Sequence, residues 1–305
     1  MPQGSTLYRI GLGGWEHDVF DQCLYPRPGM SSAEKLAWYA QYFNTVEIRQ
    51  TFWDDGLTGK DARVWATAVR EFPSFTFIVK LHASFTHAAV IRPDAVRSVR
   101  GILQELSQRN RLEALLLQFP YGFTNTSTHR FHIARLAREF AGYPLHVEFR
   151  HESWQTSGLN AFLKEHRLCI VGADMPRTRH YMPFVAAGAG DTAYLRLHGR
   201  NERGWLLDTY DAKYDYLYNA KETREIARRV AALAPRYDAV TIIANNTTGG
   251  KSIPIALQLI SALRGGKTVS VPSASLAAFP FLRAIAREEP TDGLPLDETG
   301  LRQAM

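Results

Sequence analysis

Short apolar runs rich in β-branched residues recur eight times along this 305-residue chain, and this repetition constrains the fold more than any other feature. Runs of this kind, bounded by turn residues, predict buried strands. We expect strands over residues 8–12, 45–48, 76–80, 114–119, 145–149, 168–173, 193–198 and 239–244.

Amphipathic stretches of helical length separate most of these strands. In the clearest one, Ile226, Val230 and Leu233 recur at spacings of four and three, with charged residues between them. We expect helices over residues 33–43, 62–71, 95–108, 128–140, 159–166, 222–233 and 252–263. The stretch 176–191 is irregular and contains two glycines near its end, so the helix expected there is short or broken.

Alternation of strands and helices predicts a parallel sheet with crossover connections, and eight repeats match a single (β/α)8 TIM barrel. An open doubly wound sheet is the alternative. It would need a GxGxxG first turn, and the sequence GLGGWE at residues 11–16 lacks that spacing. We expect the barrel to span residues 1–265. Residues 266–305 form a C-terminal extension, expected to be a helix packed on the barrel and then a frayed end.

The net charge of +6 is spread evenly, because residues 1–150 and 151–305 each carry +3. A diffuse excess does not favour a nucleic-acid partner, which stays possible. No apolar run approaches the length of a membrane span, and the first residues lack the pattern of a signal peptide. We therefore expect a cytoplasmic protein without a membrane partner; its oligomeric state is left open.

Charged residues alternate with apolar ones on several expected strands. In residues 145–150, Val147 and Phe149 share one face, and Glu148 and Arg150 share the other. Because the apolar faces should meet the helices, the polar faces should point into the barrel. This predicts that the interior receives His146, Glu148, Arg150, Tyr194, Arg196, His198, Glu47 and Arg49.

Polar residues also gather where the expected strands end. The carboxyl ends of barrel strands converge on one mouth, where TIM-barrel active sites are built. At or just past these ends lie Glu47, Lys80, Gln118, Glu148, Asp174, His198, Asn245 and Asn246. Burying so many polar groups is costly unless they pair or hold a ligand. The structural alternative is a self-satisfied ion-pair network, such as one between Glu148 and Arg196.

Several segments occur in a characteristic order across residues 8–263. They include GGW (13–15), LYP (24–26), TVEIRQTFW (45–53), LLLQFP (115–120), VEFRHESW (147–154) and YLRLHGR (194–200). Together they resemble the YecE-like family, which is catalogued as a domain of unknown function. The resemblance implies a (β/α)8 barrel related in shape to the xylose isomerase and endonuclease IV group, and it implies no particular reaction. This chain departs from the family at Trp53, where Tyr is usual, and at TTGGKS (247–252).

We interpret the mouth first as an enzyme site for metal-independent acid/base chemistry, without a cofactor, on a small phosphate- or carboxylate-bearing molecule that is sugar- or nucleotide-like. The candidate catalytic residues are Glu47, Lys80, Glu148, Asp174 and His198. Glu47 and Glu148 are the base candidates, and Lys80 or His198 would be the acid. Arginine forks bind carboxylate or phosphate at two points. The candidate binding residues are Trp15, His87, Gln118, Arg150, His151, Trp154, Arg196, Arg200, Asn245 and Asn246.

A divalent-metal isomerase, phosphoesterase or nuclease is the second interpretation. Its ligands would be Glu47, Glu148, Asp174 and His198, a plausible oxygen and nitrogen set for Mn, Mg or Zn. Cations expected on the same inward faces would repel such an ion, so no metal is predicted.

A third interpretation concerns NNTTGGKS at residues 245–252, which follows a strand and opens a helix. Gly249, Gly250, Lys251 and Ser252 could bind phosphate, because glycines allow close approach and a helix N-terminus is electropositive. The alternative is a plain turn with Ser252 as helix cap. A further alternative is that the protein is not an enzyme but a module that binds nucleic acid or protein without catalysis.

Overall fold

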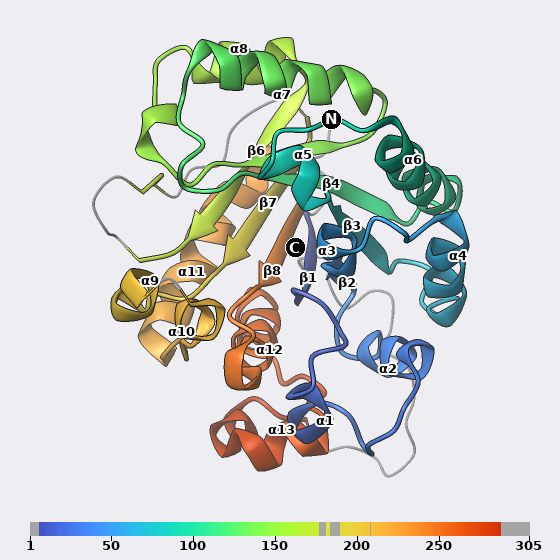
Figure 1. The fold of residues 1–305 in the computed structure, drawn as a ribbon. Coiled ribbons are helices and arrows are strands. Elements are labelled where there is room, and N and C mark those ends of the chain that lie inside the picture. The colour runs from blue at the N-terminus through green and yellow to red at the C-terminus, as the bar shows by residue number, and fades with distance from the viewer. Residues whose placement is uncertain (1–5, 177–180, 184–189, 208, 288–305) are drawn as a thin grey trace.

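The computed structural model describes residues 6–176, 181–183, 190–207 and 209–287. Its core is a closed barrel of eight parallel strands that pair in sequence order, with β1 against β8 (Figure 1). The strands are β1 (Leu7–Leu12), β2 (Thr45–Ile48), β3 (Thr76–Lys80), β4 (Leu112–Gln118), β5 (Leu145–Glu148), β6 (Leu168–Asp174), β7 (Thr192–Leu197) and β8 (Ala239–Ala244). The expected (β/α)8 barrel is confirmed, with strand ends within two residues of those expected.

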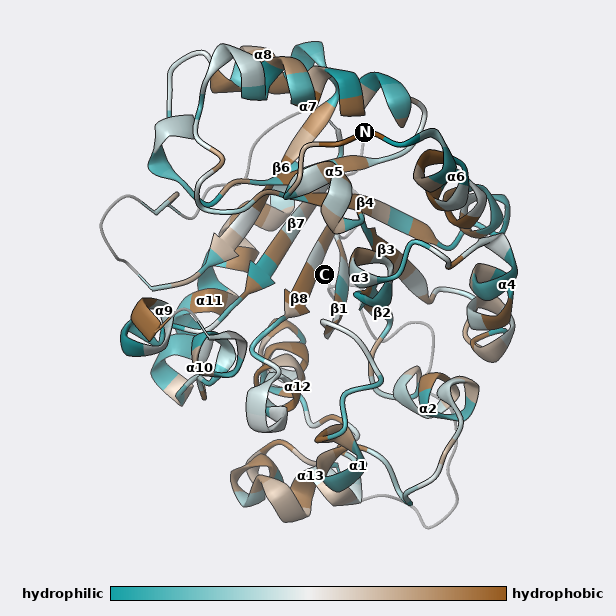
Figure 2. Ribbon diagram, viewed as in Figure 1, coloured by the Kyte–Doolittle hydropathy of each residue, from teal (hydrophilic) through white to brown (hydrophobic). Residues whose placement is uncertain are grey.

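Helices surround the barrel, and most of them contain both polar and apolar residues, whereas the strands are mainly apolar (Figure 2). The outer helices are α2 (Ser32–Tyr39), α4 (Gly59–Ala68), α6 (Pro93–Gln108), α7 (Ser127–Glu139), α8 (Leu159–Glu165), α11 (Ala220–Leu233) and α12 (Ser252–Leu263). Shorter elements follow the strand ends or connect helices: α1 (Phe20–Cys23), α3 (Gln50–Trp53), α5 (Ala83–Thr86), η1 (Glu152–Trp154), α9 (Glu202–Leu207), α10 (Tyr210–Tyr214), η2 (Ala234–Arg236) and η3 (Thr248–Gly250).

Three outer helices begin at capping boxes, which explains where they start. In α2, the Ser31 hydroxyl accepts from the backbone N–H of Glu34, and the Glu34 carboxylate accepts from the backbone N–H of Ser31. Thr58 and Asn219 begin α4 and α11 in the same way. Each box satisfies backbone donors that the first helical turn leaves without partners.

A side chain completes the pairing between β1 and β2, where only two residue pairs are in register. The Tyr39 hydroxyl, on α2, accepts from the Leu12 N–H at 2.7 Å and donates to the Thr45 carbonyl at 2.8 Å. A Cβ at Gly11 would lie 1.9 Å from that same carbonyl oxygen, so this position requires glycine. The barrel is therefore closed at this seam by Tyr39.

The connection between β6 and β7 contains no helix among the described residues; 177–180 and 184–189, where a short or broken helix was expected, lie outside them. On the outer side of β6, a cavity of about 1330 Å³ is lined by residues of α8 and α11, with Ile170 and Asp174 of β6 at its base. In the described part of the chain, no helix is long and apolar enough to cross a membrane.

After α12 the chain continues into α13 (Ser273–Ala278) and η4 (Pro280–Ala284). Helix α13 lies beside α1 (Figure 1), and the Ser275 hydroxyl donates to the Cys23 carbonyl at 2.6 Å. Leu282 is fully buried in the main core. The division between the barrel and the C-terminal extension at residue 265 stays a prediction. The expected frayed end lies beyond residue 287, outside the described residues.

Candidate active site

The barrel interior is built in two layers. Below lies an apolar cluster of Ile78, Ala114, Leu116, Val171, Tyr194 and Ile243. Because inward positions recur every second residue, the next inward positions along β3, β4, β7 and β8 are Lys80, Gln118, Arg196 and Asn245. The sequence therefore changes from apolar to polar where the strands open into the mouth. This is the placement expected from strand alternation.

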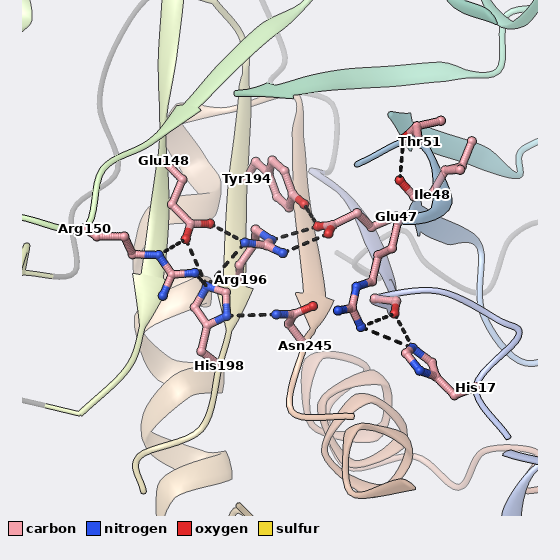
Figure 3. A network of polar contacts seen from close by, with 12 residues as sticks. His17, Glu47, Ile48, Thr51, Glu148, Arg150, Tyr194, Arg196, His198 and Asn245 are labelled. Carbon is pink, nitrogen blue, oxygen red and sulfur yellow. Dashed lines mark hydrogen bonds and ion pairs between the residues drawn. The ribbon is translucent and has the colours of Figure 1, made fainter. Parts of the chain in front are cut away.

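Arg196 is the centre of the polar layer and joins two carboxylates from different strands (Figure 3). Its Nε and Nη2 lie 2.7 and 2.8 Å from the two oxygens of Glu47, a two-point contact. Its Nη1 lies 2.6 Å from Oε2 of Glu148. The Tyr194 hydroxyl also donates to Glu47, at 2.5 Å. This part of the site matches the self-satisfied ion-pair network that the sequence left open as an alternative.

The second oxygen of Glu148 faces a group of side chains nearer the mouth. Arg150 Nε lies 2.6 Å from it in an ion pair, and His198 Nε2 lies 3.2 Å from it. Asn245 Nδ2 lies 3.0 Å from the other ring nitrogen of His198 (Figure 3). Both contacts are hydrogen bonds when His198 carries its proton on Nε2. Burial and the neighbouring Arg150 lower the pKa of His198 to about 3, so its ring is neutral at pH 7.

Both glutamates are ionised although they are completely buried. Burial alone would raise the pKa of Glu47, but Arg196 and Lys80 outweigh it and hold the pKa below its ordinary value. In Glu148, Arg150 and Arg196 likewise overcome burial and hold the pKa well below the ordinary value. A carboxylate that is so strongly stabilised as an anion is a weak base. The structure thus disfavours the base role expected of these two residues.

Lys80, at the end of β3, differs from its charged neighbours. It is 9% exposed, and among the described residues none forms an ion pair or hydrogen bond with its Nζ. The nitrogen lies 3.7 Å from the centre of the Phe52 ring. The Thr51 hydroxyl donates to the Lys80 carbonyl at 2.7 Å, which holds α3, and with it Phe52, against the end of β3.

Burial, with repulsion from Arg196, lowers the pKa of Lys80 from 10.5 to about 7. That displacement corresponds to about 5 kcal/mol, because one pKa unit is about 1.4 kcal/mol. The Phe52 ring favours the ammonium, but a cation–π contact contributes about 2 kcal/mol at most. The pKa of Lys80 therefore stays well below its ordinary value, and both the amine and the ammonium forms are populated near neutral pH.

The field of the mouth is positive. Lys80 and Arg150 contribute, after burial, to lowering the pKa of His87 to about 4. Burial and Arg49 lower the pKa of His17 to about 4 as well. The guanidinium groups of Arg49 and Arg196 act on Lys80, and that of Arg150 acts on His198. An anionic molecule is attracted to such a site.

Asp174 does not join this group. Val171 faces the interior, so alternation turns Asp174 to the outer side of β6. There Arg200 binds it at two points, at 2.8 and 2.7 Å, and the Tyr218 hydroxyl donates to it at 2.9 Å. Asp174 and Arg200 therefore form a separate structural cluster, away from Glu47 and Glu148. The placement argues against the catalytic and substrate-binding roles expected of them.

The residues proposed as a metal site are not brought together either. Among the described residues, no group of three or more His, Cys, Asp or Glu side chains could hold a metal ion. Arg196 lies between Glu47 and Glu148, and Asp174 faces outward. The alternative set of Glu47, Glu148, Asp174 and His198 is thus not assembled.

Two tryptophans expected in the mouth are packing residues instead. Trp15 is fully buried, contacts Trp65 edge-on and lies 3.2 Å from the Ser32 hydroxyl. Trp154 stacks on Phe149 with ring centres 4.0 Å apart and donates to the Phe123 carbonyl at 2.8 Å.

The remaining predicted residues lie around the mouth. Gln118 pairs in register with Glu148. His87 caps α5, with its ring centre 5.0 Å from that of Phe52. His151 lies on the rim, 5.0 Å from the Tyr121 ring centre.

The loop after β8 forms a compact turn. Asn246 holds it by donating to the carbonyls of Tyr216 and Lys251 at 2.8 and 3.1 Å. Gly249 and Gly250 adopt positive φ angles, and a Cβ on Gly250 would lie 2.4 Å from the Cys23 sulfur. Lys251 is paired with Asp215, and Ser252 is fully buried. These contacts favour the plain-turn alternative over phosphate binding, although Ser252 makes no side-chain cap.

Sequence reasoning did not include Tyr194, Arg49, His17 and Phe52 among the site residues. Tyr194 and Arg49 were expected on the inward faces of their strands, so the alternation of side chains along a strand could have identified them as site residues. His17 lies on the loop after β1 and Phe52 on the four-residue helix α3 after β2, and both segments are too short for a periodic signal. A cavity of about 590 Å³ near these loops is lined by Gly14, Glu16, His17, Arg49, Gln50 and Trp53.

Comparisons with known proteins identify the family and agree with the barrel fold. A family model described as "Protein of unknown function DUF72" matches residues 9–280, nearly the range of the resemblance noted in the sequence. The UPF0759 protein YunF of Bacillus subtilis is 27% identical over 273 residues, covering 83% of this chain and 94% of YunF.

Two solved structures of DUF72 family proteins also match. One, from Thermotoga maritima, is 27% identical with a TM-score of 0.74, covering 84% of this chain and 99% of the other. One from Enterococcus faecalis is 22% identical with a TM-score of 0.71, covering 84% and 95%, and shows the fold alone.

Proposed function

Because this chain belongs to the DUF72 family of proteins of unknown function, we propose its function from the chemistry of the barrel mouth. We propose that it is an enzyme that transfers protons to and from a small anionic molecule, with Lys80 as the acid/base group. The observation that carries this proposal is a buried lysine without an ion pair among the described residues, beside two carboxylates already neutralised by arginines.

Proton transfer is most efficient when the pKa of the catalytic group lies near the working pH. Lys80 meets this condition, whereas Glu47, Glu148 and His198 hold pKa values well away from neutrality. The neutral amine would take a proton from the substrate and return it as the ammonium. The proposal therefore moves the base from the glutamates to Lys80.

The other residues of the mouth would position the reactants. The guanidinium groups of Arg150 and Arg49 would favour a carboxylate or phosphate on the substrate. In the Asn245–His198–Glu148 chain, Asn245 donates to the neutral His198 ring, and that ring donates to the Glu148 carboxylate. This chain would fix the orientation of a hydroxyl or carbonyl group. The Arg196 pairs hold both glutamates in place during the reaction.

Proton transfer at carbon can be tested before the substrate is known. The purified chain is incubated in deuterated water with a panel of phosphorylated sugars, sugar acids and 2-oxo acids, and deuterium uptake into carbon positions is followed by NMR. We expect uptake into at least one compound, and a loss of about a hundredfold or more in Lys80→Met.

The control is Lys35→Met, because Lys35 is also mostly buried but pairs with Asp21 at 2.7 Å, away from the mouth. It should keep the wild-type uptake rate. Uptake unchanged in Lys80→Met, or absent across the whole panel, would contradict the proposal.

A further inference from the structure

Lys80 has a second chemical capacity, which rests on the proposed function of the same site. Its nitrogen lies against an aromatic face, and both neighbouring carboxylates are held by arginines. An amine in such a place is available to attack as well as to take a proton. We propose that Lys80 forms a covalent imine with a small carbonyl compound that carries one carboxylate or phosphate group.

The proposed step balances without an external oxidant or reductant. The Lys80 nitrogen adds to the carbonyl carbon, and the carbonyl oxygen takes up a proton to give a carbinolamine. Protonation of that hydroxyl and loss of water then give the iminium ion. The sum is one neutral amine, one carbonyl compound and one proton, giving one iminium and one water. The iminium draws electrons from the adjacent carbon, which lowers the barrier to proton removal or carbon–carbon cleavage there.

The surroundings of Nζ suit an iminium as well as an amine. The centre of the Phe52 ring lies 3.7 Å from Nζ, and the face of that ring attracts the iminium cation. Glu47 and Glu148 are close enough to act on the charge of Lys80, and both remain anionic. Arg196 contacts both oxygens of Glu47 and one of Glu148, and Arg150 contacts the other oxygen of Glu148. The two glutamates therefore offset the iminium charge without a direct ion pair that would hold the free amine as ammonium.

The substrate class follows from the charges around Lys80. The mouth holds the guanidinium groups of Arg49, Arg150 and Arg196, of which Arg49 and Arg196 are close enough to Lys80 to act on its charge, and this group of cations attracts a carboxylate or phosphate. A carboxylate or phosphate a few bonds from the carbonyl carbon would reach toward Arg150 or Arg49 while the carbonyl faces Nζ. Pyruvate and dihydroxyacetone phosphate represent these two sources of the anionic group.

The test is reductive trapping. The full chain at pH 7 is incubated with pyruvate or with dihydroxyacetone phosphate, reduced with sodium borohydride, digested and mapped by mass spectrometry. Borohydride delivers hydride to the iminium carbon and makes the bond permanent. We expect the adduct on Lys80, with saturable dependence on concentration and at least about tenfold higher occupancy than on Lys35 in the same sample.

The adduct map of the wild-type chain is sufficient for this test, because Lys35 in the same sample serves as the comparison. The test therefore does not depend on the folding of a variant. Lys80→Met should remove the adduct and leave the background on other lysines unchanged. Labelling of Lys80 by one compound but not the other identifies the anionic group. Equal labelling of all lysines, or none with either compound, overturns the imine.

This outcome is separable from that of the proposed function. Deuterium uptake that persists without trapping would mean that Lys80 acts as a proton carrier only, which overturns the imine and leaves the proposed function in place. If neither deuterium uptake nor a trapped adduct is observed, both the proposed function and the imine are overturned.

Discussion

At the residue scale, Arg196 contributes more to the site than any other side chain. It is 1% exposed and is the shared partner of Glu47 and Glu148. Removing one partner of a buried ion pair leaves an uncompensated charge and costs about 3–5 kcal/mol. We therefore expect Arg196→Met to lower the free energy of unfolding by about that amount, measured by urea denaturation at pH 7.

The matched control is Arg63→Met. Arg63 also binds a carboxylate at two points, Glu105 at 3.0 and 3.2 Å, but on the exposed surface. Because water screens that pair, its loss should change stability much less. Similar losses in the two variants would show that the central network is not buried as described.

The titration of Lys80 makes a second prediction with a definite sign. Its pKa is about 7 in the folded chain, against about 10.4 in an unfolded one. Between these values the unfolded chain binds more protons, so stability rises with pH by up to about 1.4 kcal/mol per unit. Below pH 7 both states are protonated, and the penalty for burying the charge is fully present.

The measurement is the difference in unfolding free energy between wild type and Lys80→Met from pH 7 to 9.5. The wild-type value should rise relative to the variant. A constant difference across that range would mean that Lys80 has an ordinary pKa.

Individual residues also show where prediction from the sequence stops. Alternation placed Arg196 and Glu148 correctly, because the polar and apolar faces of their strands differ. Lys80 was indicated by its position at a strand end. In β6 all residues before Asp174 are apolar or glycine, so composition gave no sign of which face pointed inward. Asp174 was therefore assigned to the mouth from its position at the strand end, and the structure turns it outward.

At the scale of elements, the strands were more predictable than the contacts between them. Seven of the eight outer-layer connections were expected to hold helices, and the structure has them. The use of Tyr39 to complete the β1–β2 seam was not foreseen, because a hydroxyl between two strands leaves no periodic signal. It depends on how α2 packs across both strands.

This seam supports a third prediction. Tyr39→Phe removes the hydroxyl and takes this hydrogen-bond partner from the Leu12 N–H and the Thr45 carbonyl in a buried setting. A buried backbone group without a partner costs about 1–3 kcal/mol. We expect a loss of that size in thermal or urea unfolding. Tyr143→Phe, at a half-buried tyrosine on the outer layer, should cost clearly less; equal losses would contradict the role of the seam.

At the scale of the whole molecule, the segment after residue 265 tests how far the barrel core extends. Leu282 is fully buried, whereas its neighbour Phe281 is 45% exposed. If this segment unfolds together with the barrel, Leu282→Ala should lower global stability by about 2–5 kcal/mol, the usual cost of a core truncation. Phe281→Ala should cost much less.

The two variants are compared by circular dichroism and tryptophan fluorescence during urea unfolding. A single shared transition is expected for both probes. A separate early transition in Leu282→Ala, with the barrel unaffected, would show that the segment is an independent appendage.

The reactive side chains lie on strands, whereas residues around the entrance lie on the segments after the strands, and this separation affects how such a barrel can evolve. Lys80, Arg196 and Glu148 project from strands whose pairing fixes them, whereas Trp53, which is 70% exposed, stands on a short helix after β2. Substitutions around Trp53 can reshape what enters the mouth without dismantling the groups that would react. A lineage built on this frame is free to exchange one substrate for another while keeping the same reactive amine.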